Sequence, residues 1–217
     1  MKYTLQVFSG PWHAAGEAPE KTVRRIGEIC GRIPVERVIV GWRTDPAFYR
    51  MLGSQLRRAG IECRMLSLDG TEAVTGSHGI AVQADGGFPG CDPDTLDGLI
   101  LPGGKPGTAH LAQSEALLDA LRRFSAAGKL TAAICAAPTV LAKAGLLAGK
   151  RACCYPSREA ELAEAGALVS REPAVRDGTI VTSRGMGTAV DFGLHLVEYF
   201  QGEEKARELA RAIVWEH

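Results

Sequence analysis

Short apolar runs alternate along the chain with segments that carry an apolar stripe at helical spacing. Apolar runs of about four to eight residues are typical of strands buried on both faces, and striped segments are typical of helices that cover a sheet. The pattern predicts strands at 37–41, 61–68, 79–83, 99–101 and 130–134, a hairpin at 174–182, and helices at 45–59, 114–127, 138–144, 187–200 and 203–215. These repeated strand–helix units predict an α/β fold with a mainly parallel sheet covered on both faces.

The segment 187–200 differs from the other predicted helices because it is apolar on most of its faces. Val190, Phe192, Leu194 and Leu196 do not fall on a single stripe. A helix that is apolar all round is buried or lies at an interface. The pattern therefore favours either a central position in the fold or contact with a second chain.

Residues 1–36 add one more strand–helix unit before the first of these strands. Residues 3–8 favour a strand, and 19–32 places Val23 and Ile26 on one helical stripe. The simplest interpretation is a βα extension packed on the same domain as residues 37–217.

Composition narrows the class of protein without pointing to a substrate. The 217 residues are 46% hydrophobic and 23% charged, with 25 basic residues against 25 acidic ones. This balance predicts neither a nucleic-acid partner nor an anionic membrane partner. The first ten residues are too short and polar for a signal peptide, and no run is apolar over the ~18 residues of a membrane span. Six cysteines without an export signal predict reduced thiols and a cytoplasmic location.

One cysteine lies where a predicted strand runs directly into a predicted helix. Cys135 follows the strand 130–134, and Ala136, Ala137 and Pro138 continue into the helix. Small neighbours suit the sharp turn of a nucleophile elbow, and a helix N-terminus lowers the pKa of a thiol. The loop PGGKPG at 102–107 ends the preceding strand, so the backbone N–H groups of Gly104 and Ala136 are candidates for an oxyanion hole. The alternative is that Cys135 is a small, inert core residue.

Three segments together resemble the ThiJ/PfpI superfamily, and most closely its DJ-one branch. They are LILPGGKPGTAHL, AAICAAPTVLAKAGLL and TSRGMGTAVDFGLHLVE, and the resemblance runs in consistent order from Val38 to Gln201. It implies a flavodoxin-like three-layer α/β/α sandwich, usually a homodimer. It also implies that Cys135 is a reactive elbow cysteine and that Gly104 and Ala136 supply backbone donors.

The chain departs from the family pattern at the position of a protonated glutamate that normally accompanies the cysteine. Counted back without gaps from Gly60, that position is Phe48, and the nearest acid is Asp45, whose simpler interpretation is a helix cap before Pro46. A frequent histidine of the family falls at Tyr155, whose ordinary pKa near 10 makes it a poor base at neutral pH.

Other polar residues are candidates for acid–base work or for binding an anion. Arg184 in TSRG matches an arginine that the family places near the cysteine, and a plain ion pair is its alternative role. The loop 9–20 carries His13 and Glu17, which would supply the missing acid–base group if the loop reached the site. No cofactor is expected, and without a Cys/His ligand spacing no metal is expected either.

Two functions from different classes follow. The first is a cysteine-dependent enzyme, glyoxalase- or deglycase-like or a related hydrolase or lyase, in which Cys135 attacks a small carbonyl compound. The second is a non-catalytic sensor of oxidants or reactive carbonyls, or a chaperone-like protein, in which Cys135 becomes oxidised. A peptidase or glutamine amidotransferase would need a histidine beside the cysteine, but Ala136 stands there. The expected partners are a small-molecule substrate and a second copy of the chain.

Overall fold

The computed structural model describes residues 36–41, 46–76 and 81–215, with side chains from residue 52 onward. The predicted elements within residues 3–32 and the candidates His13, Glu17 and Asp45 therefore lie outside the described residues. The packing of residues 1–36 on the same domain is therefore not tested and stays a prediction.

A seven-stranded sheet forms the middle layer of the fold. Its strand order is β10-β11-β7-β6-β1-β2-β5, and every neighbouring pair is parallel except β10 and β11, which are antiparallel. The strands of this sheet are β1 (Glu36–Gly41), β2 (Glu62–Ser67), β5 (Gly86–Gly87), β6 (Gly98–Leu101), β7 (Leu130–Ile134), β10 (Ala174–Asp177) and β11 (Ile180–Ser183). The expected mainly parallel sheet is thus confirmed, as is the 174–182 hairpin.

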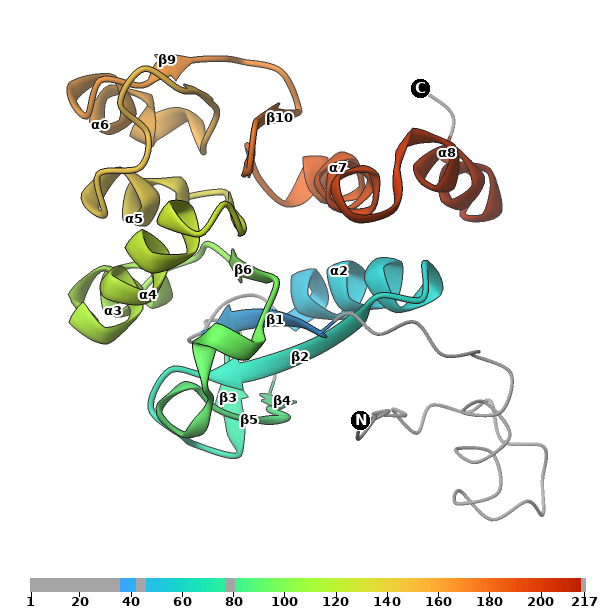
Figure 1. Ribbon diagram of the computed structural model, residues 1–217, viewed down its shortest axis with the longest axis horizontal. Coiled ribbons are helices and arrows are strands. Elements are labelled where there is room, and N and C mark those ends of the chain that lie inside the picture. The colour runs from blue at the N-terminus through green and yellow to red at the C-terminus, as the bar shows by residue number, and fades with distance from the viewer. Residues whose placement is uncertain (1–35, 42–45, 77–80, 216–217) are drawn as a thin grey trace.

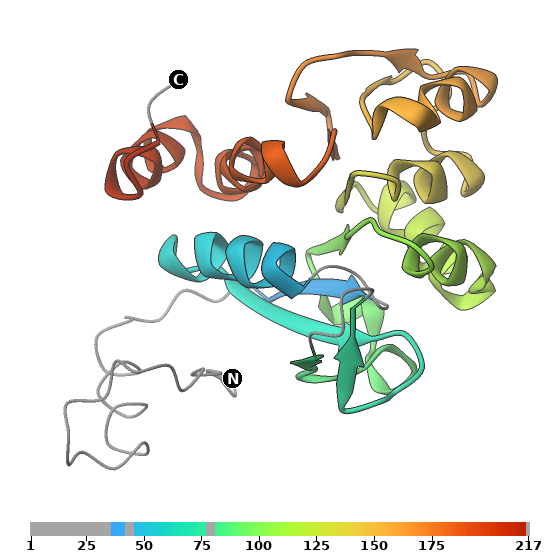
Figure 2. The same ribbon diagram turned by 180° about the vertical axis from the view of Figure 1, so that it is seen from behind.

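Helices cover both faces of this sheet, which completes the three-layer α/β/α sandwich (Figure 1). The layers separate in the same way when the molecule is seen from behind (Figure 2). Helices α2 (Pro46–Arg58), α7 (Ala189–Gln201) and α8 (Glu203–Ala212) lie on one side, and α3 (Gly107–Gln113), α4 (Glu115–Ala126), α5 (Pro138–Lys143) and α6 (Glu159–Glu164) lie on the other. Among the described helices, none is long and apolar enough to cross a membrane.

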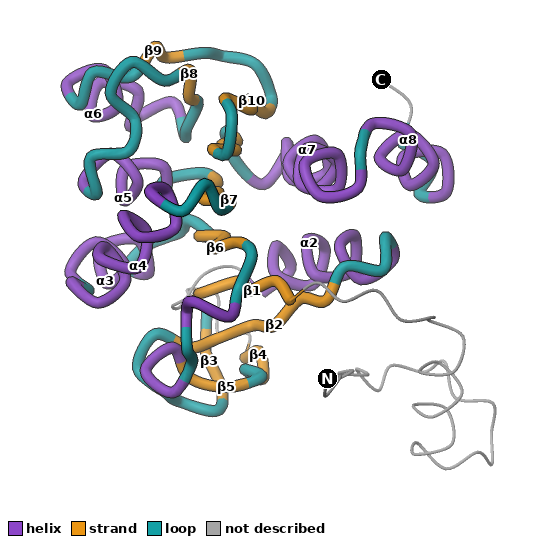
Figure 3. The backbone as a smooth tube through the Cα atoms, in the orientation of Figure 1, coloured by secondary structure: helices purple, strands orange, loops and turns teal. Residues whose placement is uncertain are grey.

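Smaller elements decorate this core (Figure 3). Two pairs of short strands stand apart from the main sheet, and four single turns of 3-10 helix occur in the loops. They are β3 (Ala73–Thr75) with β4 (Ala81–Gln83), β8 (Arg151–Ala152) with β9 (Leu168–Val169), η1 (Phe88–Gly90), η2 (Pro93–Thr95), η3 (Pro156–Arg158) and η4 (Met186–Thr188). The apolar pattern predicts neither α3 nor α6, and of these strands it predicts only β4.

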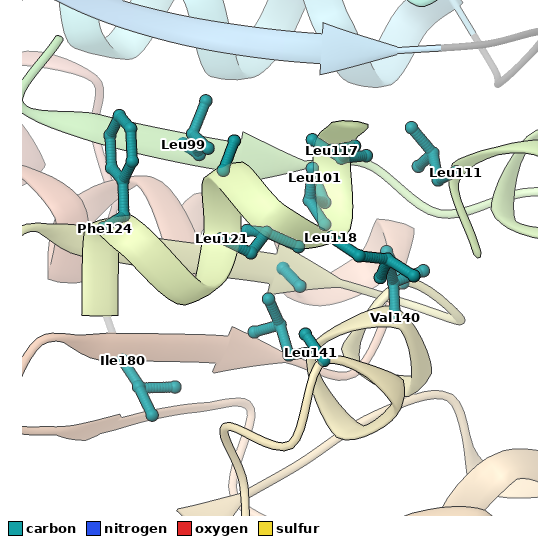
Figure 4. Packing of buried hydrophobic residues seen from close by; sticks show 14 of the residues in the cluster. Leu99, Leu101, Leu111, Leu117, Leu118, Leu121, Phe124, Val140, Leu141 and Ile180 are labelled. Carbon is teal, nitrogen blue, oxygen red and sulfur yellow. The ribbon is translucent and has the colours of Figure 1, made fainter. Parts of the chain in front are cut away.

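Helix α4 shows how the sequence builds the core. The Ser114 hydroxyl caps the helix by accepting a hydrogen bond from the Leu117 N–H over 3.3 Å. Leu117, Leu121 and Phe124 recur at helical spacing and are buried against the leucines of β6 (Figure 4). Each such side chain contributes about 1.5–3 kcal/mol when it leaves water, so this stripe fixes the helix on the sheet.

The unusual apolar character of α7 is largely explained within one chain. Phe192, Leu196 and Val197 are fully buried, and the helix packs against α2, α8 and the β10–β11 hairpin. The prediction that this helix is buried is therefore confirmed. Its composition no longer requires contact with a second chain.

Candidate active site

The candidate site lies at the carboxyl edge of two adjacent parallel strands. Strands β6 and β7 pair in register from Gly98–Leu130 to Leu101–Ala133. The loop 102–104 follows β6 and Cys135 follows β7, so both emerge at the same edge of the sheet. The strand order reverses next to this edge, between β1 and β6. From β1 the chain continues to β2 on one side, and β6 lies on the other side of β1. Ligands of open α/β sheets bind at such switch points.

Cys135 occupies a sharp turn whose backbone is left-handed. Its φ of 64° lies in a region that non-glycine residues rarely adopt, at a cost of about 1–3 kcal/mol. Two hydrogen bonds hold the turn: the Cys135 N–H donates to the Ser183 carbonyl over 2.9 Å, and the Tyr155 N–H donates to the Cys135 carbonyl over 2.7 Å. The conformation expected of a nucleophile elbow is thus present at Cys135.

The glycine loop packs directly against this elbow. A Cβ atom at Gly103 would lie 2.6 Å from Cβ of Cys135, 2.7 Å from the Ile134 oxygen and 2.8 Å from the Ala136 nitrogen. Real Cβ atoms do not approach other atoms so closely, so only glycine fits at position 103. This residue was not singled out from the sequence, although the PGG motif contains the signal.

Ala136 and Gly104 carry the two backbone N–H groups that are predicted from the sequence as oxyanion donors. The Ala136 N–H donates a hydrogen bond to the Cys135 thiol. Gly104 adopts a φ of 108°, and its carbonyl accepts hydrogen bonds from the Thr108 N–H over 2.9 Å and the Thr108 hydroxyl over 3.1 Å. The Gly104 N–H has no backbone acceptor among the described residues. Both predicted donors thus lie at the carboxyl edge of the sheet, Gly104 in the loop after β6 and Ala136 in the turn after β7.

The pKa of the Cys135 thiol is raised, contrary to the expectation from its place before a helix. Desolvation by burial is the larger cause and raises the pKa, while the hydrogen bond from the Ala136 N–H lowers it. Helix α5 has only six residues, so its dipole is small. Burial therefore outweighs the helix terminus at this site.

Arg184 follows Ser183, whose carbonyl accepts the hydrogen bond from the Cys135 N–H, but the Arg184 guanidinium contacts Glu159 and Arg171. Nη2 lies 3.9 Å from Oε1 of Glu159, and Nη1 donates to the Arg171 carbonyl over 3.4 Å. These contacts match the ion-pair role weighed for it. The Nε atom is buried and makes no hydrogen bond within the described part of the chain.

Tyr155 lies beside the elbow, as its place in the sequence predicts. It comes just before η3, and its residue surface is 49% exposed. Phe48 is the third residue of α2, and its side chain lies outside the described residues. In the described chain, no carboxylate or imidazole makes a hydrogen bond to the Cys135 sulfur.

Comparison with known proteins gives a family for this arrangement. The family description "DJ-1/PfpI family" matches residues 49–199, which include the glycine loop, the elbow and the 183–188 loop. The chain belongs to the DJ-1/PfpI family. The match is narrower at both ends than the resemblance traced from Val38 to Gln201, and it begins one residue after Phe48.

Relatives in the DJ-1/PfpI family cover most of the chain. Protein dj-1beta of Drosophila melanogaster is 40% identical over 159 residues, which are 73% of this chain and 85% of the relative. Glutathione-independent glyoxalase DJR-1.2 of Caenorhabditis elegans is 32% identical over 161 residues, 74% of this chain and 85% of the relative. The crystal structure of Drosophila melanogaster DJ-1beta superposes with a TM-score of 0.78 at 34% identity and covers 85% of this chain and 100% of that structure's chain. The expected flavodoxin-like fold is confirmed.

Proposed function

We propose that this protein is a cysteine-dependent catalyst that acts on small 2-oxoaldehydes through Cys135, in the manner of a glyoxalase or deglycase. The observation that carries the proposal is the left-handed Cys135 elbow, whose thiol accepts a hydrogen bond from the Ala136 N–H while the 102–104 loop packs against it. Further support comes from the relative named glutathione-independent glyoxalase.

The first chemical step needs only the parts found at this edge of the sheet. The Cys135 sulfur attacks the aldehyde carbon, a C–S bond forms, and the carbonyl π pair moves to the oxygen. In this proposal the N–H groups of Gly104 and Ala136 stabilise the developing oxyanion. The thiol proton passes to that oxygen, so the product is a neutral hemithioacetal.

The second step requires a group that moves a proton between carbon atoms. The hydrogen on the former aldehyde carbon must leave as a proton and one must return to the neighbouring carbon, while the hydroxyl proton of the hemithioacetal moves to the neighbouring carbonyl oxygen. The resulting thioester is hydrolysed by water to a 2-hydroxy acid and the free Cys135 thiol. General acid–base catalysis contributes about 10²–10⁴-fold to such steps. Asp45, His13 and Glu17 are the candidates for this role, together with the Tyr155 hydroxyl. With Phe48 at the usual glutamate position, we expect slow turnover.

Incubation with methylglyoxal tests this function. We expect native mass spectrometry to show one methylglyoxal bound through Cys135 and lactate to form slowly, while Cys135→Ser shows neither. Failure of wild-type protein to form the Cys135 adduct would contradict the proposal. Fast turnover that survives removal of Asp45, His13 and Glu17 in turn would contradict the account of the missing acid.

A sensor of oxidants or reactive carbonyls is the second candidate function. It is favoured by one observation: within the described residues, the thiol has a backbone donor but no side-chain acid or base in contact with it. Such a site forms an adduct without completing a catalytic cycle. An adduct that accumulates without any lactate would support the sensor over the enzyme.

We also infer that the protein works as a homodimer, as the family resemblance implies, and that it is cytoplasmic, as its six cysteines without an export signal predict. Sedimentation at micromolar concentration should give twice the 23.0 kDa chain mass, and a single 23.0 kDa species would contradict the dimer.

A further inference from the structure

Two loops bracket the peptide of Cys135 and meet each other beside it. One begins at Tyr155, whose N–H donates to the Cys135 carbonyl, and the other begins at Ser183, whose carbonyl accepts from the Cys135 N–H. A Cβ atom at Gly185 would lie 3.8 Å from Cδ2 of the Tyr155 ring, which is ordinary van der Waals contact. The edge of the Tyr155 ring therefore lies near Gly185, on a residue whose backbone is hydrogen-bonded to Cys135.

Both loops are held in place by hydrogen bonds. The Ser183 hydroxyl donates to the Pro173 carbonyl over 2.8 Å and lies 2.7 Å from the Thr188 hydroxyl. The Thr188 hydroxyl in turn accepts from the Gly185 N–H over 3.0 Å. The Tyr155 carbonyl accepts from the Arg158 N–H over 2.8 Å. Hydrogen bonds thus hold the backbone of the loops from which the aromatic ring extends.

The apolar surface at this place is open to solvent. Tyr155 is 49% exposed and Met186 on the facing loop is 59% exposed, although large apolar side chains elsewhere in the described chain are mostly buried. A half-exposed aromatic ring, on a residue hydrogen-bonded to the backbone of a nucleophile, is suited to contact a planar or apolar group on a bound molecule.

The charged groups near Tyr155 are occupied with one another. Glu159 pairs with Arg171 over 3.2 Å and approaches Arg184 at 3.9 Å. Arg184 also donates to the Arg171 carbonyl. Because these charged groups contact one another, the exposed ring of Tyr155 is the contact that we consider for a substrate among the described residues near Cys135.

We propose that Tyr155 is a specificity-determining residue whose ring binds the aromatic or bulky apolar substituent of a carbonyl substrate. This inference rests on the proposed function for the identity of the substrate, and it makes aryl 2-oxoaldehydes such as phenylglyoxal better substrates than methylglyoxal. Aromatic contacts of this kind change affinity by about tenfold.

The ring contact is tested first without turnover, by alkylation of Cys135. The measured quantity is the rate with 2-iodo-N-benzylacetamide divided by the rate with iodoacetamide, each normalised to the same reaction of glutathione. We expect a ratio of about ten for wild type and Tyr155→Phe, because the hydroxyl is not needed. Tyr155→Ala and Tyr155→His should lower it to about one to three. Both variants keep the backbone N–H bond to Cys135, and unfolding curves check that they fold.

Leu168→Ala is the matched control, because Leu168 is 60% exposed on β9 and makes no backbone hydrogen bond to the elbow. It should leave the ratio at the wild-type value. A Tyr155→Ala ratio equal to that of wild type would overturn the inference, and so would a Tyr155→Phe ratio as low as that of Tyr155→Ala.

Initial rates with phenylglyoxal and methylglyoxal form the second arm. We expect kcat/KM to favour phenylglyoxal about tenfold in wild type, mainly through KM, and Tyr155→Ala to remove that preference. If neither aldehyde turns over while the alkylation ratio still depends on the ring, the enzymatic function fails and the Tyr155 contact stands. If both turn over with no preference that depends on Tyr155, the function stands and the inference fails.

Discussion

Phe48→Glu is expected to raise kcat/KM for methylglyoxal by about 10²–10⁴-fold, the range that a well-placed general acid–base group contributes. Position 48 lies in the first turn of α2, which follows β1, and β1 is a direct neighbour of β6 in the sheet. The first turn of α2 therefore starts at the same edge of the sheet as the glycine loop and the elbow. A carboxyl group there would supply the proton transfer that phenylalanine cannot make.

Phe48→Gln is the control, because it is polar and of similar length but cannot exchange a proton at neutral pH. We expect no comparable gain from it, and none from Phe48→Glu combined with Cys135→Ser. Steady-state lactate formation measures all three. Equal gains from Glu and Gln, or no gain from Glu while Cys135 still alkylates normally, would contradict the assigned role of this position.

Gly103→Ala is expected to damage both the fold and the site. The added methyl group would overlap Cβ of Cys135 and two backbone atoms of the elbow, none of which is the end of a flexible side chain. Forcing extra volume into a packed region costs about 1–3 kcal/mol. We expect that loss in the free energy of unfolding, together with at least tenfold slower formation of the Cys135 adduct because the loop that carries Gly104 must shift.

Gly90→Ala provides the matched comparison. Gly90 has nothing within 4 Å of the position its Cβ would take, and its φ is not in the left-handed region. Denaturant unfolding should place Gly90→Ala within about 0.5 kcal/mol of wild type. If Gly103→Ala were equally harmless and kept the Cys135 reactivity, the close packing of loop and elbow would not matter for the site.

Much of the fold could be predicted from the local pattern of apolar residues. The elements that this pattern does not predict are missed for physical reasons. Strands β1, β6 and β7 are short apolar runs, and the residues of β6 and β7 are buried throughout, so the apolar pattern locates all three strands within about a residue. Helix α3 was missed because its seven residues bury only Gly107 and Leu111, which leaves no stripe to detect. The paired strands β8 and β9 have two residues each and exist through a pairing across the chain that no local pattern records.

The sequence predicts the position of Cys135 in a sharp turn, but not the direction in which the pKa of its thiol is shifted. The small residues around Cys135 signal a sharp turn, and the structure has that turn. The pKa of the thiol was expected to fall, because the sequence predicts a helix after the cysteine but not how deeply the sulfur is buried. The apolar faces of α7 suggested an interface, but the contacts with α2 and α8 depend on distant parts of the chain. The partners of Arg184 likewise come from residues that are close only in space.

The central claim is that Cys135 is the reactive thiol of the folded protein. Among its competitors, Cys153 and Cys154 are almost fully buried, and burial contributes most to raising their pKa to about 11 and about 12. Cys135 is only partly buried and has the Ala136 N–H to stabilise its thiolate. Because the thiolate is the nucleophile, Cys135 should react before Cys153 and Cys154.

Iodoacetamide labelling of the native protein from pH 6 to pH 10, with each site assigned by mass spectrometry, tests this claim most directly. Because burial raises the pKa of Cys135 above its ordinary value, its thiolate fraction and its labelling rate should keep rising with pH above neutrality and not level off near pH 7. Cys135 should be the first site labelled throughout. Faster labelling of Cys91 or Cys154, or a Cys135 rate that is already constant below pH 7, would contradict the account.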